Sequence, residues 1–255
     1  MLVRGHVGAV IDGGVLNVTL DRPEARNAQT PATWAALAAL GEACSQGGVD
    51  VVIFRGAGTA FSSGLDRRMF TLEGVPGEAS LAEMAAMADA ELVERIEEFQ
   101  AAFLWQRESP AMTVAAVHGA AIGAGFQLAL ACDVLLASPD ASFAMRETSY
   151  GLVPDLGGTG PLVRAVGYAR AVEICATGRA IDAEEGYRLG FVTRIAPDLD
   201  AAVADLVAAV RAAPSGAVRE LKPLLAHAES VDRREQSRAE RLAQVRRLRQ
   251  LLGGG

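Results

Sequence analysis

Short apolar segments alternate with helical patterns through the middle of this chain of 255 residues. VDVVIFRG (49–56) and AMTVAAVHG (111–119) are mostly apolar and end at glycine, as buried strands of a parallel sheet do. The helical pattern GFQLALAC (125–132) follows, and a third apolar segment, DVLLAS (133–138), comes directly after it. Strand–helix alternation of this kind predicts parallel βαβ units and an α/β fold.

The two ends of the chain differ from this middle. Residues 15–20 alternate apolar and polar side chains after the turn sequence DGG, which predicts a β-hairpin. Thr30 and Pro31 are typical of a helix start, here of an Ala- and Leu-rich helix to about Ser45. Residues 81–108 predict one long helix or two shorter ones. Helical patterns dominate after Gly151, over 161–176, 182–189, 199–213, 216–228 and 232–252.

The last of these helices carries an apolar stripe on a charged surface. Leu242, Val245, Leu248 and Leu252 recur at helical spacing, so they share one face of the helix. Packing against the protein's own core is the favoured interpretation of this stripe, and packing against a neighbouring subunit is the alternative.

Composition restricts the class of protein. Hydrophobic residues make up 51% of the chain and charged residues 22%, which is typical of a globular protein with a sizeable core. The apolar runs stop short of the ~18 residues of a membrane span, and the first residues lack the apolar segment of a signal peptide. We therefore expect a cytoplasmic protein without a membrane partner. A net charge of −7 argues against nucleic acid as a partner.

The cysteines indicate neither a disulfide framework nor a metal site. Cys44, Cys132 and Cys175 are far apart, odd in number and set in apolar surroundings, and no CxxC pair occurs. We expect buried free thiols in a reducing compartment, and no bound metal.

Two turns combine small residues with the start of a helix or turn. FSSGLD (61–66) and IGAGF (122–126) each follow a strand. Free backbone N–H groups at such a turn point outward and attract negative charge. Two such donors that converge on one carbonyl oxygen would stabilise an enolate. Taken singly, either turn is explained equally well by tight packing of a strand against a helix.

Together with their flanks, these turns resemble the enoyl-CoA hydratase/isomerase (crotonase) superfamily over residues 10 to about 231. The segments that carry the resemblance are RPEARNA, AFSSGLD, HGAAIGAGFQLALACD, FAMRETSYGLVPDLGG and ATGRAIDAEEGYRLGFVTRI. The resemblance implies an α/β fold: a ClpP/crotonase-like spiral of ββα units over 1–195 that binds acyl-CoA, and a helical trimerisation region over 196–255. It also implies a homotrimer or a dimer of trimers, with a coenzyme A thioester as substrate and no permanently bound cofactor.

The same resemblance implies roles for individual residues. The N–H groups of Ser63 and Ala124 match the two oxyanion donors. Hydratases of the family use two glutamates, of which the second matches Glu147, whereas Gln127 occupies the place of the first. An amide cannot exchange protons, while an isomerase needs only one carboxylate. The resemblance thus favours an enoyl-CoA isomerase with Glu147 as base. The alternatives are a hydratase that uses Glu147 alone and a non-catalytic acyl-CoA binding protein.

Asp155 is the second candidate acid. It stands where hydratases usually have glycine and where some ring and dienoyl isomerases have a catalytic aspartate. The alternative is a helix N-cap for the segment after Gly157. Gln127 is expected to orient the acyl group or a water, and on this interpretation Gln127→Glu would restore a two-carboxylate hydratase site.

The remaining candidates concern coenzyme A. The resemblance places Arg26, Ala28, Ser62, Ser63, Gly64, Leu65 and Asp66 along its groove. Arginine suits phosphate because its guanidinium is a planar fork, and the arginines that flank the two loops are Arg22, Arg26, Arg67 and Arg68. Plain surface charge is the alternative for these arginines. His118, which closes the strand before the oxyanion turn, is interpreted as structural.

Overall fold

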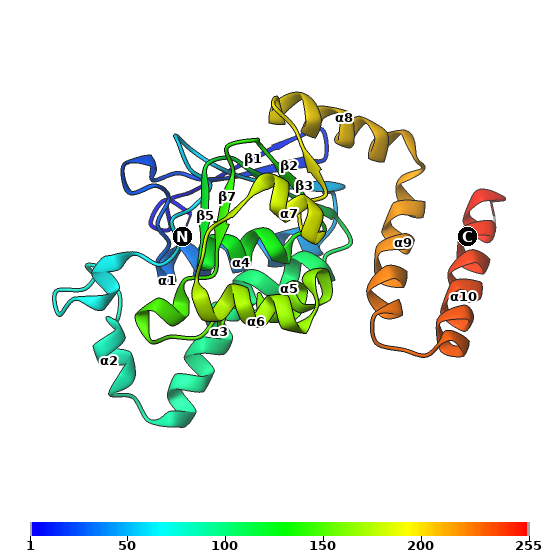
Figure 1. Ribbon diagram of the computed structural model, residues 1–255. Coiled ribbons are helices and arrows are strands. Elements are labelled where there is room, and N and C mark those ends of the chain that lie inside the picture. Colours follow the sequence, from blue (N-terminus) through cyan, green and yellow to red (C-terminus); the bar gives the residue numbers. More distant parts are fainter. Residues whose placement is uncertain (1, 254–255) are drawn as a thin grey trace.

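The computed structural model describes residues 2–253, which form two β-sheets and the helices around them (Figure 1). The larger sheet has the strand order β1-β2-β3-β4-β6-β9, antiparallel between β1 and β2 and parallel from β2 onward. Its strands are β1 (Val7–Asp12), β2 (Val15–Leu20), β3 (Val51–Gly56), β4 (Met112–Val117), β6 (Val134–Ala137) and β9 (Arg194–Ile195). The smaller sheet is β5 (Ala120–Ile122), β7 (Ser142–Ala144) and β8 (Ile181–Asp182), in that order.

The N-terminal elements confirm the predictions made for them. Asp12 pairs with Val15 across Gly13 and Gly14, whose φ angles of 53° and 84° suit a tight hairpin turn. The helix α1 (Pro31–Ser45) begins at the proline, where a missing N–H costs no hydrogen bond.

The helices follow the sequence pattern, with two interruptions. The pattern left the one within 81–108 open and missed the one within 161–176. Residues 81–108 are two helices, and the stretch predicted over 161–176 is divided at Gly167, whose φ of 79° few other residues adopt. The helices after α1 are α2 (Leu81–Ala85), α3 (Asp89–Glu108), α4 (Ala124–Ala131), α5 (Thr159–Val166), α6 (Tyr168–Thr177), α7 (Ala183–Leu189), α8 (Leu199–Ala212), α9 (Ser215–Ala228) and α10 (Arg233–Leu251). Short 3-10 turns are η1 (Pro23–Ala25), η2 (Arg67–Phe70) and η3 (Glu147–Tyr150).

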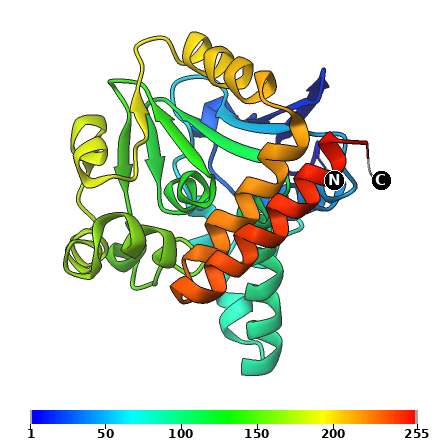
Figure 2. The same cartoon turned by 90° about the vertical axis from the view of Figure 1, so that its right-hand side faces the viewer.

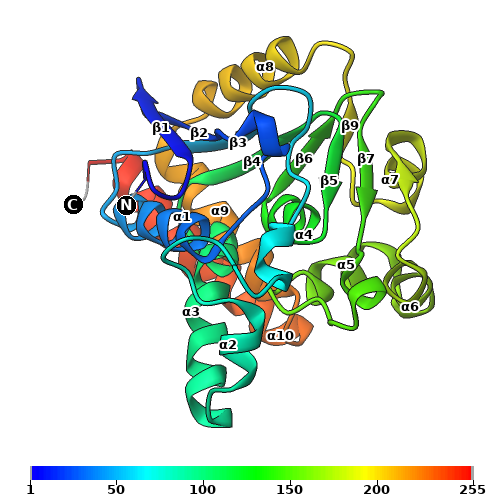
Figure 3. The ribbon, with the colours of Figure 1, turned by 90° about the vertical axis from the view of Figure 1, so that its left-hand side faces the viewer.

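The main core surrounds α4. All eight residues of this helix are buried, and Figure 3 shows it near the centre of the molecule, with α5 beside it. Phe126 of α4 packs against Phe143 and Phe191 at ring-centroid distances of 5.3 and 5.1 Å. A helix buried on every side is held firmly, so α4 is a rigid support for the turn at its start.

A second, smaller core lies between the larger sheet and α8. Ala202 and Val203 of α8 pack there with residues of β3 and β4 such as Ile53 and Val114. The sequence-based division at residue 195 therefore falls just before a helix that packs on the sheet. The division groups α8 with α9 and α10, although α8 packs on the larger sheet. The division itself stays a prediction.

The helices α9 and α10 form an arm at one side of the molecule (Figure 1), and Figure 2 shows them side by side, in front of the rest of the chain. Lys222, the only lysine of the sequence, ties α9 to the body. Its ammonium group pairs with Asp133 at 2.8 Å and donates to the carbonyls of Gln106 and Ala111.

The apolar stripe of the last helix does not pack on the protein's own core. Leu242, Val245 and Leu248 are 52, 44 and 46% exposed, and Leu252 is exposed as well. The favoured interpretation from sequence was wrong because α10 packs on α9 rather than on the sheets.

The expected free thiols are present. Cys44 and Cys132 are buried, whereas Cys175 is partly exposed, contrary to expectation.

Among residues 2–253, no three His, Cys, Asp or Glu side chains gather closely enough to hold a metal ion. No single helix in this range has the length and apolar character to cross a membrane. The bent pair of 199–212 with 216–228 meets those criteria only when its halves are taken together.

Candidate active site

Backbone pairing brings the two turns predicted from sequence into contact. The N–H of Ser62 donates to Ala120 O, and the N–H of Ile122 donates to Ser62 O, both at 2.9 Å. Gly64 has φ +84°, and a Cβ built on it would lie 2.5 Å from Ile122 O and 3.5 Å from the nitrogen of Ala124. The small residues therefore permit a close approach of two backbones.

Of the two oxyanion donors expected, one is free and one is not. Ala124 opens α4, so its N–H has no acceptor within the helix. The N–H of Ser63, in contrast, donates to Arg26 O at 2.9 Å, and this corrects the expectation for Ser63. Within residues 2–253, the N–H of Leu65 forms no hydrogen bond. Leu65 follows Gly64 directly, so it carries the available donor of this turn.

Glu147 opens η3 and lies at the second turn. Its Oε1 is 3.2 Å from the point where a Cβ on Gly123 would stand, so a side chain at 123 would crowd the carboxylate. Its Oε2 is buried and, among the described residues, without a hydrogen-bond partner. Burial raises the pKa of Glu147 above its ordinary value, and the charge of Asp155 adds to this rise. A desolvated carboxylate with a raised pKa is suited to taking and returning a proton.

Gln127 binds Glu147 directly. Its Nε2 donates to Glu147 Oε1 at 2.7 Å. Its Oε1 accepts from the N–H groups of Leu156 and Gly158 at 3.0 and 3.2 Å. Both ends of the amide therefore have partners inside the fold, and the expectation that Gln127 orients an acyl group or a water stays a prediction that concerns its second N–H.

Asp155 lies near Glu147 but caps no helix. The N-cap of α5 is Gly158, without a hydrogen bond from any side chain, so the capping interpretation is wrong. Gln100 of α3 donates to Asp155 O at 2.7 Å and braces this segment. Desolvation raises the pKa of the Asp155 carboxyl, although the residue is exposed. Asp155 is thus close enough for its charge to act on Glu147, and its catalytic role stays a prediction.

The arginines divide into two groups. Arg22 is 5% exposed and pairs with Asp66 at 2.7 Å, and Arg68 pairs with the same carboxylate at 2.8 Å. Burial raises the pKa of Asp66, but the hydrogen bonds from Arg68 and Arg22 outweigh it and lower that pKa to about 2. These three side chains hold the loops together, although Arg68 is itself half exposed. Arg26 and Arg67 are exposed and, among the described residues, pair with no carboxylate.

Other groove residues also serve the fold. The hydroxyl of Ser62 is buried, donates to Asn27 O and accepts from Gln29 Nε2. Ala28 and Ser63 are only partly buried, so they remain available to a ligand. Sequence reasoning missed Asn27, whose amide donates to Ala57 O and Ala60 O, although asparagine in a loop is a frequent backbone partner.

An aromatic pair that sequence reasoning also missed joins the two halves of the site. Phe70 of η2 and Tyr150 of η3 have ring centroids 5.3 Å apart, and Arg67 donates to the Tyr150 hydroxyl at 3.4 Å. The pair spans from the end of the first turn to the segment that carries Glu147.

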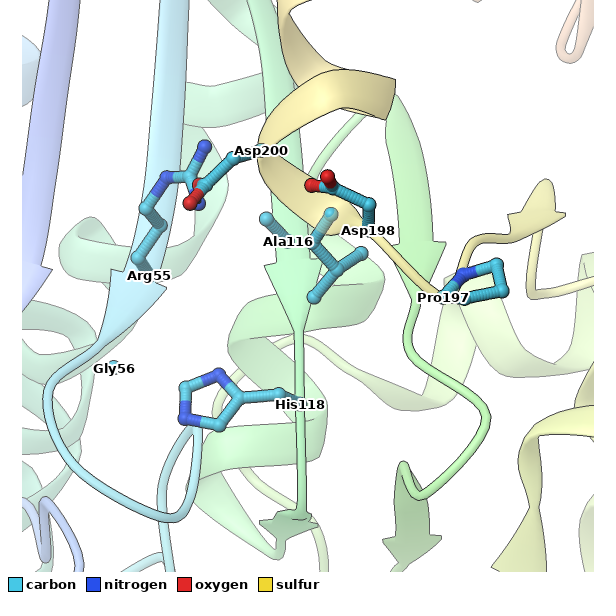
Figure 4. A pocket seen from close by; sticks show the side chains of 8 residues that line it. Arg55, Gly56, Ala116, His118, Pro197, Asp198 and Asp200 are labelled. Atoms are coloured by element: carbon cyan, nitrogen blue, oxygen red, sulfur yellow. The ribbon is translucent and has the colours of Figure 1, made fainter.

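His118 lies in a different cleft, of about 480 Å³, at the ends of β3 and β4 (Figure 4). Its lining is Arg55, Gly56, Ala116, His118, Pro197, Asp198, Leu199 and Asp200, a set that includes none of the acids or donors above. His118 Nε2 is 2.9 Å from Gly58 O, which agrees with a structural role.

The chain is similar in sequence to known enoyl-CoA hydratases and isomerases. The family model described as enoyl-CoA hydratase/isomerase matches residues 10–250. A probable enoyl-CoA hydratase of Rhodobacter capsulatus is 38% identical over 191 residues, 74% of this chain and 68% of that protein. A peroxisomal Delta(3,5)-Delta(2,4)-dienoyl-CoA isomerase of Arabidopsis thaliana is 35% identical over 147 residues, 58% of this chain and 52% of that protein.

Solved structures match the whole fold. A putative enoyl-CoA hydratase of Thermobifida fusca in complex with acetoacetyl-CoA has a TM-score of 0.93 and 45% identity. The match covers 98% of this chain and 97% of that one. The same protein in complex with CoA gives a TM-score of 0.92 at 44% identity, over 99% and 96% of the two chains. The chain therefore belongs to the enoyl-CoA hydratase/isomerase family and has the crotonase fold, and it is an acyl-CoA enzyme of that family.

Proposed function

We propose that this enzyme is an enoyl-CoA isomerase that moves a double bond from the 3,4 to the 2,3 position. The observation that carries the proposal is that the side chain in direct contact with the Glu147 carboxylate is the amide of Gln127 and not a second carboxylate. One base suffices for a proton shift, whereas hydration gains from an acid and a base that share a water.

The steps follow from the arrangement of groups. Oε2 of Glu147 takes a proton from C2 of the 3-enoyl thioester, so a C2–H bond breaks and an O–H bond forms. The electron pair moves into the thioester as a dienolate, whose oxygen accepts from the N–H groups of Leu65 and Ala124. Oε2 then returns the proton to C4, and the double bond lies between C2 and C3. Asp155 is the second candidate for a proton carrier, because its carboxyl is near and its pKa is raised.

The coenzyme A moiety is proposed to lie along the two loops. The Thermobifida fusca neighbour was solved in complex with CoA, which supports a coenzyme A ligand for this fold. Exposed Arg26 and Arg67 are the arginines available to its phosphates, since Arg22 and Arg68 are engaged by Asp66. No permanently bound cofactor is proposed.

Product analysis with 3-enoyl-CoA and 2-enoyl-CoA substrates tests the proposed reaction. We expect conversion of 3-enoyl-CoA into 2-enoyl-CoA at least about a hundredfold faster than hydration of the latter, from the general catalysis that a second carboxylate would have supplied. Hydration as the faster reaction would favour the alternative, a hydratase that uses Glu147 alone. The names of several relatives support that alternative.

We further propose that the protein assembles as a homotrimer or a dimer of trimers through its arm. Apolar side chains of α9 and α10, among them Leu225, Leu248 and Leu251, are exposed in the single chain, and apolar side chains gathered on one pair of helices are what a subunit interface would cover. We expect light scattering at micromolar concentration to give three or six chain masses. Leu248→Asp should reduce this mass, whereas Val3→Asp, at an exposed position outside the arm, should not. A monomeric wild-type protein would contradict the proposal.

A further inference from the structure

The amide of Gln127 has only one orientation that satisfies its surroundings. Its Oε1 faces two backbone donors, Leu156 N–H and Gly158 N–H. Reversing the amide would set its NH₂ group against both donors and leave them unpaired, at about 1–3 kcal/mol for each buried group. The NH₂ group therefore points to Glu147.

The side chain is also fixed by its packing. Gln127 is 1% exposed, on a helix that is buried on every side. A Cβ on Gly158 would lie 2.6 Å from Gln127 Cγ, so the backbone of the 155–158 segment lies directly on this side chain. Gln127 thus has neither the space nor the freedom to turn away from Glu147.

We propose that Gln127 is a positioning residue, an amide clamp that fixes Oε1 of Glu147 and leaves Oε2 as the only oxygen that carries the proton. The proposal rests on the proposed function and deepens it, because it explains how one carboxylate serves two carbon atoms. Oε1 is held at 2.7 Å by an N–H, so rotation of the carboxylate about its axis would break this hydrogen bond. The basic lone pair of Oε2 keeps one direction throughout the reaction.

The clamp also changes the expectation for Gln127→Glu. In that variant one oxygen still accepts from Leu156 and Gly158, so the support of the loop is kept. The other oxygen stands where the N–H donor stood, next to Glu147 Oε1. Two carboxylates at this distance share a proton and titrate as a pair. Because the contact is direct, no water fits between the two groups, and we expect no gain in hydration.

Several groups around Glu147 affect its titration. Asp155, on the loop before α5, raises the pKa of Glu147 by its charge, whereas the hydrogen bond from Gln127 lowers it. The thiol of Cys175 on α6 is the second titratable neighbour, and its pKa is raised by burial and further by the charge of Glu147. Removing the Gln127 donor therefore raises the pKa of Glu147, and a second carboxylate raises it further.

The test compares Gln127→Glu with the wild type by two readouts. The first is ¹³C NMR titration of protein labelled at its glutamate carboxyls, with the Glu147 signal assigned by its loss in Glu147→Gln. The second is the pH profile of kcat for isomerisation. A base acts only when deprotonated, so a raised pKa moves the acid limb of that profile to higher pH. We expect both to move upward by about one pH unit or more, with acyl-CoA affinity changed less than about threefold.

Thr159→Glu is the matched control, because it adds the same charge at an exposed position that directly follows the 155–158 segment, where α5 begins. We expect it to move the Glu147 titration by much less. An unmoved titration in Gln127→Glu would overturn the clamp. So would a tenfold gain in hydration, which requires a water where the direct contact lies. A moved titration in a protein that isomerises nothing would support the clamp and contradict the proposed function, so the two failures are distinct.

Discussion

Glu147→Gln is expected to lower kcat for isomerisation by about 10²–10⁴-fold, the usual contribution of a general base. The exchange keeps the volume of the side chain and an oxygen that accepts from Gln127 Nε2, so the clamp and the fold are preserved. It removes the basicity of Oε2, on which both proton transfers depend. Steady-state kinetics with 3-enoyl-CoA measures the loss, and calorimetric titration with a non-reactive acyl-CoA should show nearly unchanged affinity.

The control for this variant is Glu42→Gln, an exposed carboxylate of α1, which should retain full activity. A Glu147→Gln enzyme with more than about a tenth of the wild-type activity would mean that another group carries the proton. Asp155→Asn would then identify it, because Asp155 is the carboxyl whose charge acts on Glu147. Loss of activity in Asp155→Asn but not in Glu147→Gln would reverse the two roles.

The fold was predictable from sequence where the pattern of apolar and turn residues within one segment is enough to identify a strand or a helix. The hairpin of β1 and β2, the start of α1, and the strands β3, β4 and β6 all follow from local patterns, as do the later helices. The strands β5, β7, β8 and β9 did not, because two or three residues have no periodicity to detect. They form only where the larger fold presents a partner, as Ser62 does for Ala121.

In the site too, the sequence identified residues but not the hydrogen bonds that their atoms form. The sequence identified both turns, Glu147 and Asp155, because each lies in a recognisable motif. It could not show which N–H of FSSGLD is free, since that depends on Arg26, whose carbonyl occupies the N–H of Ser63. Nor could it show the contact of Gln127 with Glu147, which joins residues 20 positions apart.

Charge was the least predictable property. Arg22 and Arg68 have the residue type that binds phosphate, and their places beside the loops suggested such a role. In the fold they share the buried carboxylate of Asp66. The pair with Arg22 is buried on both sides and is not released without a large cost, whereas Arg68 holds the same carboxylate from a half-exposed position. Composition gives the number of arginines but not their partners, so only the structure leaves Arg26 and Arg67 as candidates.

Gly64→Ala is expected to lower kcat by about 10²–10³-fold, as loss of one oxyanion donor does. Gly64 has φ +84°, and the new Cβ would lie 2.5 Å from Ile122 O. Because that contact is with backbone, one of the two turns must move. The movement separates the N–H of Leu65 from that of Ala124, and a dienolate oxygen can then bind only one of them. Kinetics with 3-enoyl-CoA measures the effect.

The matched control separates this loss from simple backbone strain. Gly48→Ala introduces the same side chain at φ +85°, where nothing lies within 4 Å of the new Cβ. Both variants bear the cost of a left-handed alanine, about 1–2 kcal/mol, so both should unfold at a lower temperature. Only Gly64→Ala should lose activity while it is still folded, as judged by circular dichroism at the assay temperature. If kcat of Gly64→Ala stays within about threefold of that of Gly48→Ala, the two turns do not act together on one oxygen.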